Sequence, residues 1–213
     1  MAENKVDVGG WISEAFELYK ANFGLLCLAT LVAGLLGAFT CGVLGGPMFA
    51  GLVMVILRVS RKSEPKPQVG DVFKGFDFFL QALLLVVVLA VAYGVLSFIP
   101  VIGGVAGLLI APLVMFAMPL IVDQKQEFWP AIMASFEKAK EEYVSLLVVT
   151  LLGSLISGLG LLLCGFGVIL TAPFGAIVSV VAYRHMFEGV TTEPVPVVDV
   201  PVMDVPPAEP TQA

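Results

Sequence analysis

Residues 144–183 read VSLLVVTLLGSLISGLGLLLCGFGVILTAPFGAIVSVVAY and contain no Lys, Arg, Asp or Glu. The stretch is roughly twice as long as the ~20 apolar residues that a helix needs to cross a bilayer. A turn-forming sequence, Cys164-Gly165-Phe166-Gly167, divides it near its middle. This pattern predicts two membrane-spanning helices joined by a tight turn.

Two further uncharged blocks, 23–57 and 80–122, share this design. Glycines and a proline interrupt the first block over residues 42–47 and the second over residues 100–104. The whole chain is 59% hydrophobic and 13% charged, with a mean hydropathy of +1.00, far from the averages of soluble domains. We therefore predict an all-α, polytopic membrane protein with six transmembrane helices arranged as three hairpins.

The basic residues lie only in alternate polar segments, outside the three predicted turns. They are Lys5 and Lys20; Arg58, Arg61, Lys62, Lys66 and Lys74; Lys125, Lys138 and Lys140; and Arg184. Because basic residues resist translocation, both termini and both polar loops are predicted to be cytoplasmic. The first twenty residues carry acids instead of a basic leader, so the first span is expected to be retained.

A proline stands eleven positions before the charged residue that ends each predicted hairpin. The pairs are Pro47 and Arg58, Pro112 and Asp123, and Pro173 and Arg184. This spacing predicts an internal repeat over about residues 8–62, 69–125 and 128–188 of a membrane domain, 1–188. Proline suits the first turn of a helix, so each is expected to open the second helix of its hairpin. A kink within the span is the alternative at Pro112.

A short amphipathic stretch precedes each hairpin, with aromatic side chains on one helical face. We predict three helices lying at the cytoplasmic interface, anchored at headgroup depth. The alternative is that they are the wet ends of transmembrane helices. The predicted interface anchors are Trp11, Phe16, Tyr19, Phe76, Trp129, Phe136 and Tyr183.

Small residues four positions apart recur within the spans and allow close helix packing. The predicted packing positions are Gly42, Gly46, Pro47, Gly103, Gly107, Pro112, Pro173 and Gly175. Packing inside one bundle and packing between copies of the chain both explain them. Cys41 and Cys164 occupy similar places in two turns, as a disulfide pair or as separate thiols.

The apolar blocks contain no ionisable side chain of the kind that proton or ion transport usually needs. Their polar residues, such as Tyr93, Ser97, Ser154 and Ser157, either bond to helix backbones or line a weakly polar passage. The only histidine, His185, is read as an interfacial anchor. No catalytic residues, metal ligands or cofactor are predicted, so the chain is expected not to be an enzyme.

The composition changes sharply after Gly189. Residues 189–213 are rich in Pro, contain acids and lack basic residues, which predicts a disordered tail. The sequence Pro196-Val-Val-Asp199-Val is followed by Pro201-Val-Met-Asp204-Val. This doubled unit is either a motif that docks on a partner protein or part of a solvated tail.

Several of these motifs together resemble uncharacterised six-span bacterial membrane protein families of the domain-of-unknown-function type. The motifs are Trp11 with Phe16-Glu17, Tyr19-Lys20 and Phe23; Gly46-Pro47 with Gly51 and Arg58; Asp71-Val72-Phe73 with Gly75-Phe76-Asp77-Phe78-Phe79; Ser135-Phe136 with Lys140; and Ala172-Pro173 with Tyr183-Arg184. The pattern is also similar to the membrane domain fused to some glycerophosphodiester phosphodiesterases. The resemblance implies a bacterial inner-membrane location. The fused catalytic domain has no counterpart here, so no activity is implied.

The sequence thus favours a non-enzymatic inner-membrane protein that serves as an accessory or scaffold subunit or organises the bilayer. Its expected partners are the lipid bilayer and either a membrane protein or further copies of the chain, but no nucleic acid. The alternative is a small channel or facilitator for an uncharged or lipid-like solute. A continuous polar path through Tyr93, Ser97, Ser154 and Ser157 would favour that alternative.

The topology is tested by labelling single cysteines in a variant without native thiols. Because Gly45 and Gly104 lie in predicted outer turns, cysteines there are expected to react with an impermeant reagent in intact cells. Cysteines at Lys66 or Glu127 are expected to react only after permeabilisation. Labelling of Lys66→Cys in intact cells would falsify the orientation.

Overall fold

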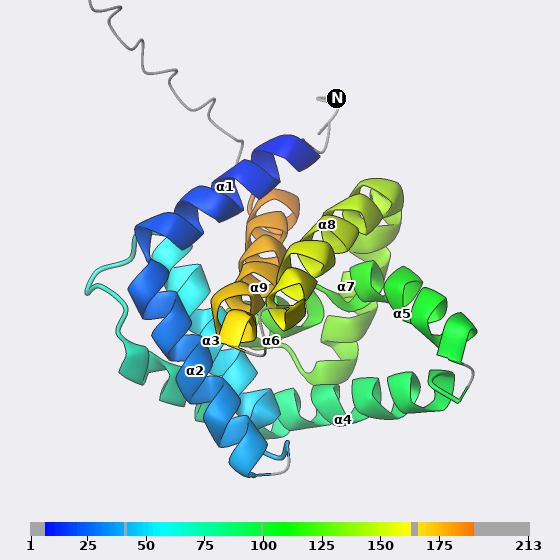
Figure 1. Ribbon diagram of the computed structural model, residues 1–213, viewed down its shortest axis with the longest axis horizontal. Helices are drawn as coiled ribbons and strands as arrows, with labels where there is room; N and C mark the ends of the chain where they lie inside the picture. Colours follow the sequence, from blue (N-terminus) through cyan, green and yellow to red (C-terminus); the bar gives the residue numbers. More distant parts are fainter. Residues whose placement is uncertain (1–6, 41, 99, 163–165, 190–213) are drawn as a thin grey trace, which may run out of the picture.

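The computed structural model describes residues 7–40, 42–98, 100–162 and 166–189, and this part of the chain is helical without strands. The elements are α1 (Val8–Ala21), α2 (Phe23–Phe39), α3 (Gly45–Ser60), η1 (Val69–Phe78), α4 (Phe79–Leu96), α5 (Pro100–Val114), α6 (Ala117–Gln124), α7 (Phe128–Glu141), α8 (Tyr143–Leu162) and α9 (Phe166–Phe187). η1 is a 3₁₀ helix. Figure 1 shows α1 at one end of the molecule and α4 at the other.

Three helices, α3, α6 and the C-terminal half of α9, form the core. We call them the core helices. Their largest fully buried side chains are Met48, Val53, Val55 and Ile56 of α3, Leu120 and Ile121 of α6, and Ile177 and Tyr183 of α9. α3 is buried almost all round, as expected of a helix that is apolar on every side.

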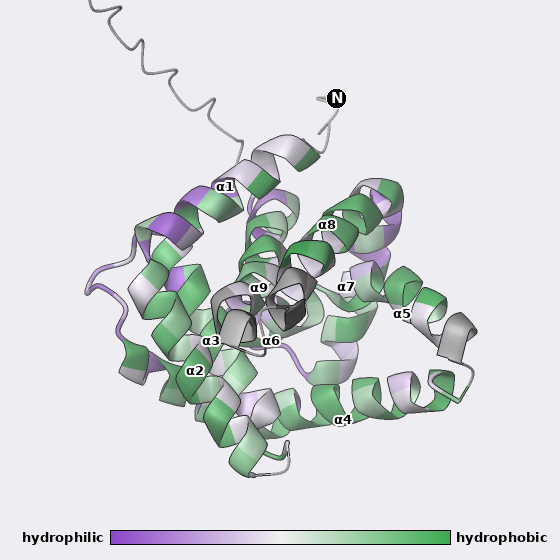
Figure 2. Cartoon of the chain, viewed as in Figure 1, coloured by the Kyte–Doolittle hydropathy of each residue, from purple (hydrophilic) through white to green (hydrophobic). Residues whose placement is uncertain are grey.

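The surrounding helices α2, α4 and α8 expose apolar side chains instead. Leu35 of α2, Val91 of α4 and Leu155 of α8 are 50%, 62% and 62% exposed. Figure 2 shows hydrophobic residues along the outer helices, most completely along α4. A surface of this kind is unfavourable in water and is suited to contact with lipid.

Two helices are long and apolar enough to cross a membrane, Val69–Leu96 and Gly103–Gln124. Two bent pairs raise the number to four if each pair is one span: α1 with α2, bent by 88°, and α7 with α8, bent by 107° over residues 128–158. α3 is apolar but has only 16 residues, about 24 Å of helix. The described chain therefore has two to four candidate spans, and six spans in three hairpins remain a prediction.

The sharp bends separate α1 and α7 from the apolar helices that follow them. At the first bend, the backbone N–H of Asn22 donates to the carbonyls of Leu18 and Tyr19, and its side chain donates to Leu18. The side-chain hydrogen bond satisfies one of the carbonyls left open at the end of α1. The second amphipathic stretch differs, because η1 continues into α4 as one 28-residue helix. At the junction of η1 and α4, Phe78 is followed directly by Phe79 without a turn-forming residue, so the helix is not interrupted.

The expectation that each proline opens a helix is right for Pro47, which lies in the first turn of α3, and wrong for Pro173, whereas Pro112 follows the stated alternative of a position within the span. Pro112 lies inside α5 and Pro173 inside α9. α5 already begins at Pro100, and α9 at Phe166. The α-helix is interrupted at residues 115–116, where Pro119 cannot donate to the carbonyl of Met115, and α6 begins at Ala117.

The backbones of α3 and η1 touch. A Cβ atom added at Gly51 would lie 1.8 Å from the carbonyl oxygen of Val72, and one at Gly75 would lie 2.0 Å from that of Pro47. Only glycine fits at either position, because the obstacle is backbone and cannot move aside. Close approach at small residues is the usual basis of helix association in lipid.

The predicted packing glycines have different surroundings. A Cβ at Gly46 would lie 2.7 Å from the carbonyl of Ala82, and one at Gly103 would lie 2.2 Å from that of Leu96, so both lie against neighbouring backbone. Gly107 faces the ring of Tyr93, and Gly175 faces the hydroxyl of Ser157. Gly42 has a φ of +88° and open space around it, so it serves the turn and not a helix contact.

Gly51→Ala tests this contact. We expect it to lower the free energy of unfolding in detergent by about 3 kcal/mol or more, because the new methyl group overlaps a backbone carbonyl. Gly34→Ala in α2 is the matched control, since nothing lies within 4 Å of its Cβ position. It is expected to be neutral or stabilising by up to about 1 kcal/mol. Equal stability of the two variants would contradict the close approach.

Candidate functional site

The C-terminal ends of the three core helices meet in a polar cluster made of Arg61, Asp123, Tyr183 and Glu188. The Arg61 guanidinium donates two hydrogen bonds to Asp123, of 2.6 and 2.8 Å, and also pairs with Glu188. Tyr183 donates from its hydroxyl to Asp123 Oδ2 at 2.8 Å. The hydrogen bond to Asp123 is the main cause that raises the pKa of Arg61, so the guanidinium stays charged. Bidentate pairs of this kind fix orientation as well as distance.

A second set of polar contacts joins α1 to α9. Glu14 is hydrogen-bonded to His185 at 2.7 Å and pairs with Arg184 at 3.4 Å. Trp11 stacks on the His185 ring with the ring centres 5.2 Å apart. Arg184 also lies 3.5 Å from Glu188. The first helix of the chain is thereby attached to the last and, through Glu188, to the polar cluster.

The charge at the end of α3 is also neutralised by ion pairs. Arg58 at the end of α3 pairs with Asp71 at 2.9 Å, and Lys74 reaches the other oxygen of that carboxylate at 2.7 Å. Asp71 also accepts the backbone N–H of Gln68 at the start of η1. The charged residues at equivalent positions of the three predicted repeats are therefore each paired with a residue of another element. These residues are Arg58, Asp123 and Arg184.

The predicted interface anchors divide into three groups by exposure. Trp11 and Tyr183 are 4% and 0% exposed, so protein contacts hold their rings. Phe16, Phe76 and Trp129 are exposed, and Tyr19 and Phe136 are partly buried. Lys20 lies 4.3 Å from the ring centre of Phe16, and Lys140 lies 4.0 Å from that of Phe136.

Ser135 is a buried polar residue that the sequence did not single out for a role. Its hydroxyl donates to the carbonyl of Leu113 at 2.7 Å and accepts the N–H of Phe116 at 3.2 Å. These two backbone groups flank the break between α5 and α6. α7 thus supplies the hydrogen bonds that the break removes from the helix.

A small cavity of about 230 Å³ lies between α5, α8 and α9. Its polar lining comes from Thr150, Ser154, Ser157 and Ser179. The Ser157 hydroxyl is buried and has no hydrogen-bond partner among the described residues.

Tyr93 and Ser97, the other members of the predicted polar path, lie elsewhere. Tyr93 donates to the carbonyl of Gly107 and Ser97 to that of Gly94. Only two of the four residues thus line the small cavity between α5, α8 and α9.

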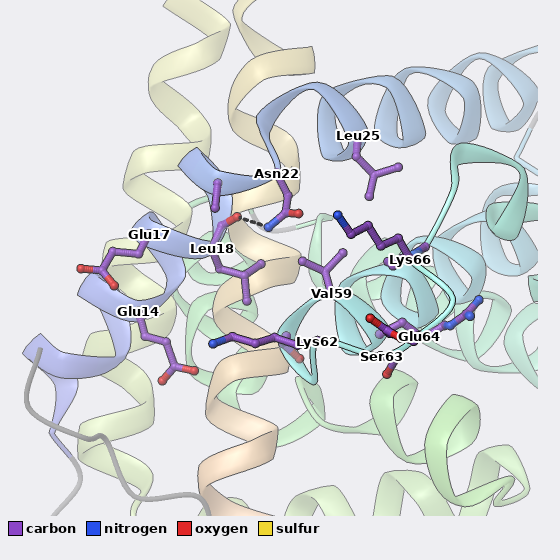
Figure 3. Close-up of a pocket in the computed structure, with 14 residues that line it drawn as sticks. Glu14, Glu17, Leu18, Asn22, Leu25, Val59, Lys62, Ser63, Glu64 and Lys66 are labelled. Atoms are coloured by element: carbon purple, nitrogen blue, oxygen red, sulfur yellow. Dashed lines mark hydrogen bonds between the residues drawn. The ribbon is translucent and has the colours of Figure 1, made fainter.

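A groove of about 690 Å³ lies between α1, the start of α2 and the segment after α3. Figure 3 shows its residues. Three carboxylates line it, Glu14, Glu17 and Glu64, together with three cations, Arg58, Lys62 and Lys66. Leu18, Leu25 and Val59 give it apolar walls. From the sequence, the basic residues among these charges were used only to predict topology. The groove itself was not predicted, because no sequence pattern indicates that residues 14–25 lie next to residues 58–67.

Within the described ranges, no group of His, Cys, Asp and Glu side chains is arranged to hold a metal ion. Cys41, Cys164 and the proposed docking residues Pro196, Asp199, Pro201 and Asp204 lie outside those ranges. Comparisons with protein-family models, with curated proteins and with solved structures give no match to this chain.

Tyr183→Phe tests the polar cluster. Loss of the 2.8 Å hydrogen bond to Asp123 from a fully buried ring is expected to lower the free energy of unfolding by about 1–2 kcal/mol. Tyr93→Phe is the control, because its hydroxyl is 3.4 Å from its acceptor, and a change within about 0.5 kcal/mol is expected. Thermal unfolding in mild detergent measures both. A Tyr183→Phe variant as stable as the control would show that the cluster adds little.

Proposed function

We propose that this protein is a non-enzymatic integral membrane protein that acts as an accessory or scaffold subunit, or organises the surrounding bilayer. The observation that carries the proposal is the filled centre of the bundle. Met48, Ile56, Phe116, Leu120 and Ile177 are each 0% exposed among the core helices and their junctions. Packed apolar side chains leave no water-filled route between these helices, which favours a structural role over conduction.

The distribution of polar groups supports the same proposal. The charges at the ends of the core helices are paired with one another or with η1 and α1, so they are occupied in holding the helices together. The outer helices meanwhile present large apolar side chains to their surroundings. A rigid core with an apolar outer face is suited to contact with lipid and with neighbouring membrane helices.

We propose further that the bundle consists of three repeats, each beginning with an amphipathic helix. The contacts between elements support this, because α3 packs against η1, α5 and α6 against α7, and α9 against α1. Thus α3 contacts the amphipathic helix that follows it in the chain, and so do α5 and α6, while α9 contacts the first amphipathic helix, α1. A small buried residue stands before the phenylalanine in all three amphipathic helices: Ala15, Gly75 and Ser135.

The inner membrane is the proposed location, with both termini in the cytoplasm, on the strength of the basic residues. A membrane protein or a second copy of the chain is the proposed partner, and the doubled Pro-Val-x-Asp-Val unit after Gly189 is the proposed docking segment.

The small serine- and threonine-lined cavity favours one second candidate, a facilitator for a small uncharged solute. Ser157 has a buried hydroxyl without a partner in the described structure, and it lines this cavity. A hydroxyl of this kind is a ready hydrogen-bonding site for such a solute.

Solute flux separates the two candidates. The purified chain is reconstituted into vesicles, and the release of entrapped urea or glycerol is followed by stopped-flow light scattering. The scaffold proposal predicts the same permeability as protein-free vesicles and no change on Ser157→Val. Flux above the protein-free rate that falls in Ser157→Val, but not in the control Ser97→Val, would establish the facilitator instead. Ser97 is a fair control because its hydroxyl lies outside the cavity.

A further inference from the structure

The groove between α1 and the segment after α3 contains two ammonium groups without ion-pair partners in the described structure. Of its three cations, Arg58 is held by Asp71 and by the carbonyl of Pro65. Lys62 and Lys66 make no such pair. In Figure 3 they extend from the segment after α3 toward α1 and the α1–α2 corner. Two ammonium groups that line one groove favour a ligand with an anionic group.

The backbone fixes where Lys62 lies. It has a φ of 50°, its N–H donates to the carbonyl of Val59, and the N–H of Ser63 donates to that of Arg58. These are the two hydrogen bonds of a glycine-type helix end, in which a non-glycine residue is disfavoured. This helix end fixes the backbone of Lys62, from which its side chain reaches the groove.

The carboxylates of the groove make an anion alone a poor match. Glu14 is paired with Arg184 and His185, but Glu17 and Glu64 have no ion-pair partner in the described part of the chain. With three carboxylates and three cations, the lining has no net charge. A ligand with both a phosphate and an ammonium group is complementary to both kinds of side chain.

The place of the groove points to a lipid as the source of such a ligand. It lies at the 88° corner where the amphipathic α1 turns into the apolar α2. Leu25 in its wall is followed one helical turn later by Leu28, which is 49% exposed, and further along by Leu35. Acyl chains can lie along this apolar stripe while the headgroup occupies the groove at the interface.

We propose that this groove binds the headgroup of a zwitterionic aminophospholipid, phosphatidylethanolamine in chemical class. Lys62 and Lys66 hold the phosphate, Glu64 receives the primary ammonium group, and Leu18, Leu25 and Val59 contact the glycerol and the first acyl carbons. This inference rests on the proposed membrane role and adds a specific lipid to it.

The test is a lipid titration of the full chain in mild detergent, followed by native mass spectrometry. Dioleoyl phosphatidylethanolamine is expected to bind about tenfold more tightly than dioleoyl phosphatidylcholine, whose methylated nitrogen has no N–H to donate to a carboxylate. Phosphatidylglycerol is expected to bind more weakly than phosphatidylethanolamine, because its headgroup has no ammonium group to donate to Glu64. Equal affinity for the three lipids overturns the proposal.

Two lysines provide a matched pair of variants. Lys62→Gly removes the ammonium group and relieves the unfavourable backbone conformation, so the variant is expected to fold. Lys125→Gly makes the same change at the end of α6, where φ is 53° and the side chain is outside the groove. The first is expected to bind phosphatidylethanolamine about tenfold more weakly, and more so with Lys66→Gln added, whereas the second binds like the parent. Parental binding by the Lys62→Gly/Lys66→Gln double variant overturns the site.

Two further arms separate the possible failures. Glycerophosphoethanolamine, which has the headgroup without acyl chains, is expected not to compete at equal concentration, and equal binding overturns the lipid assignment. Reconstitution of the chain into nanodiscs is checked first. Failure to enter the bilayer would contradict the membrane role and this inference together, whereas entry without preference for phosphatidylethanolamine contradicts this inference alone.

Discussion

The contact between the backbones of α3 and η1 is the constraint on which the rest of the bundle depends. At Gly51 and Gly75 neither helix has room for a Cβ atom, so the two backbones lie as close as peptide groups allow. In lipid the hydrophobic effect gives little drive for helices to associate, and close packing has to supply it. With η1 covering one side of α3, and with α6 and α9 also against it, α3 becomes almost fully buried although its 16 residues make it short for a span.

The ends of the core helices add the second level of organisation. Charged groups beside an apolar core are costly unless they are paired, and several of the pairs here join segments far apart in sequence. Arg61 and Asp123 join the ends of α3 and α6, Tyr183 of α9 donates to the same carboxylate, and Glu14 brings α1 onto α9. The chain is thus closed on itself: its first helix packs against its last. Closure of the bundle accounts for the burial of Trp11 and Tyr183. By residue type alone, both aromatic side chains would be expected to contact lipid headgroups.

Much of the architecture could be predicted from the uncharged blocks, because burial of so much apolar sequence requires helices and a non-aqueous surrounding. The bends at Asn22 and Glu142 lie where amphipathic sequence changes into apolar sequence, but the same change at Phe79 gives no bend, so the sequence pattern alone does not predict them. Other features were beyond sequence reasoning. Spacing alone does not reveal whether a proline opens a helix or lies inside one, and Pro112 and Pro173 lie inside. The groove is lined by α1 and by residues 58–67, which are distant in sequence. Only the three-dimensional structure shows which of its charged side chains form ion pairs and which do not.

Closure of the bundle is tested most directly by cross-linking its first and last helices. In a variant without native cysteines, Glu14→Cys and His185→Cys introduce thiols at two side chains that are 2.7 Å apart at their nearest atoms in the parent. The structure predicts that a short bis-maleimide linker joins them in membranes within one chain, seen as a single faster-migrating band, and that the link is lost when the chain is first unfolded in SDS. Efficient labelling of both thiols in membranes without a cross-link would contradict the closed bundle.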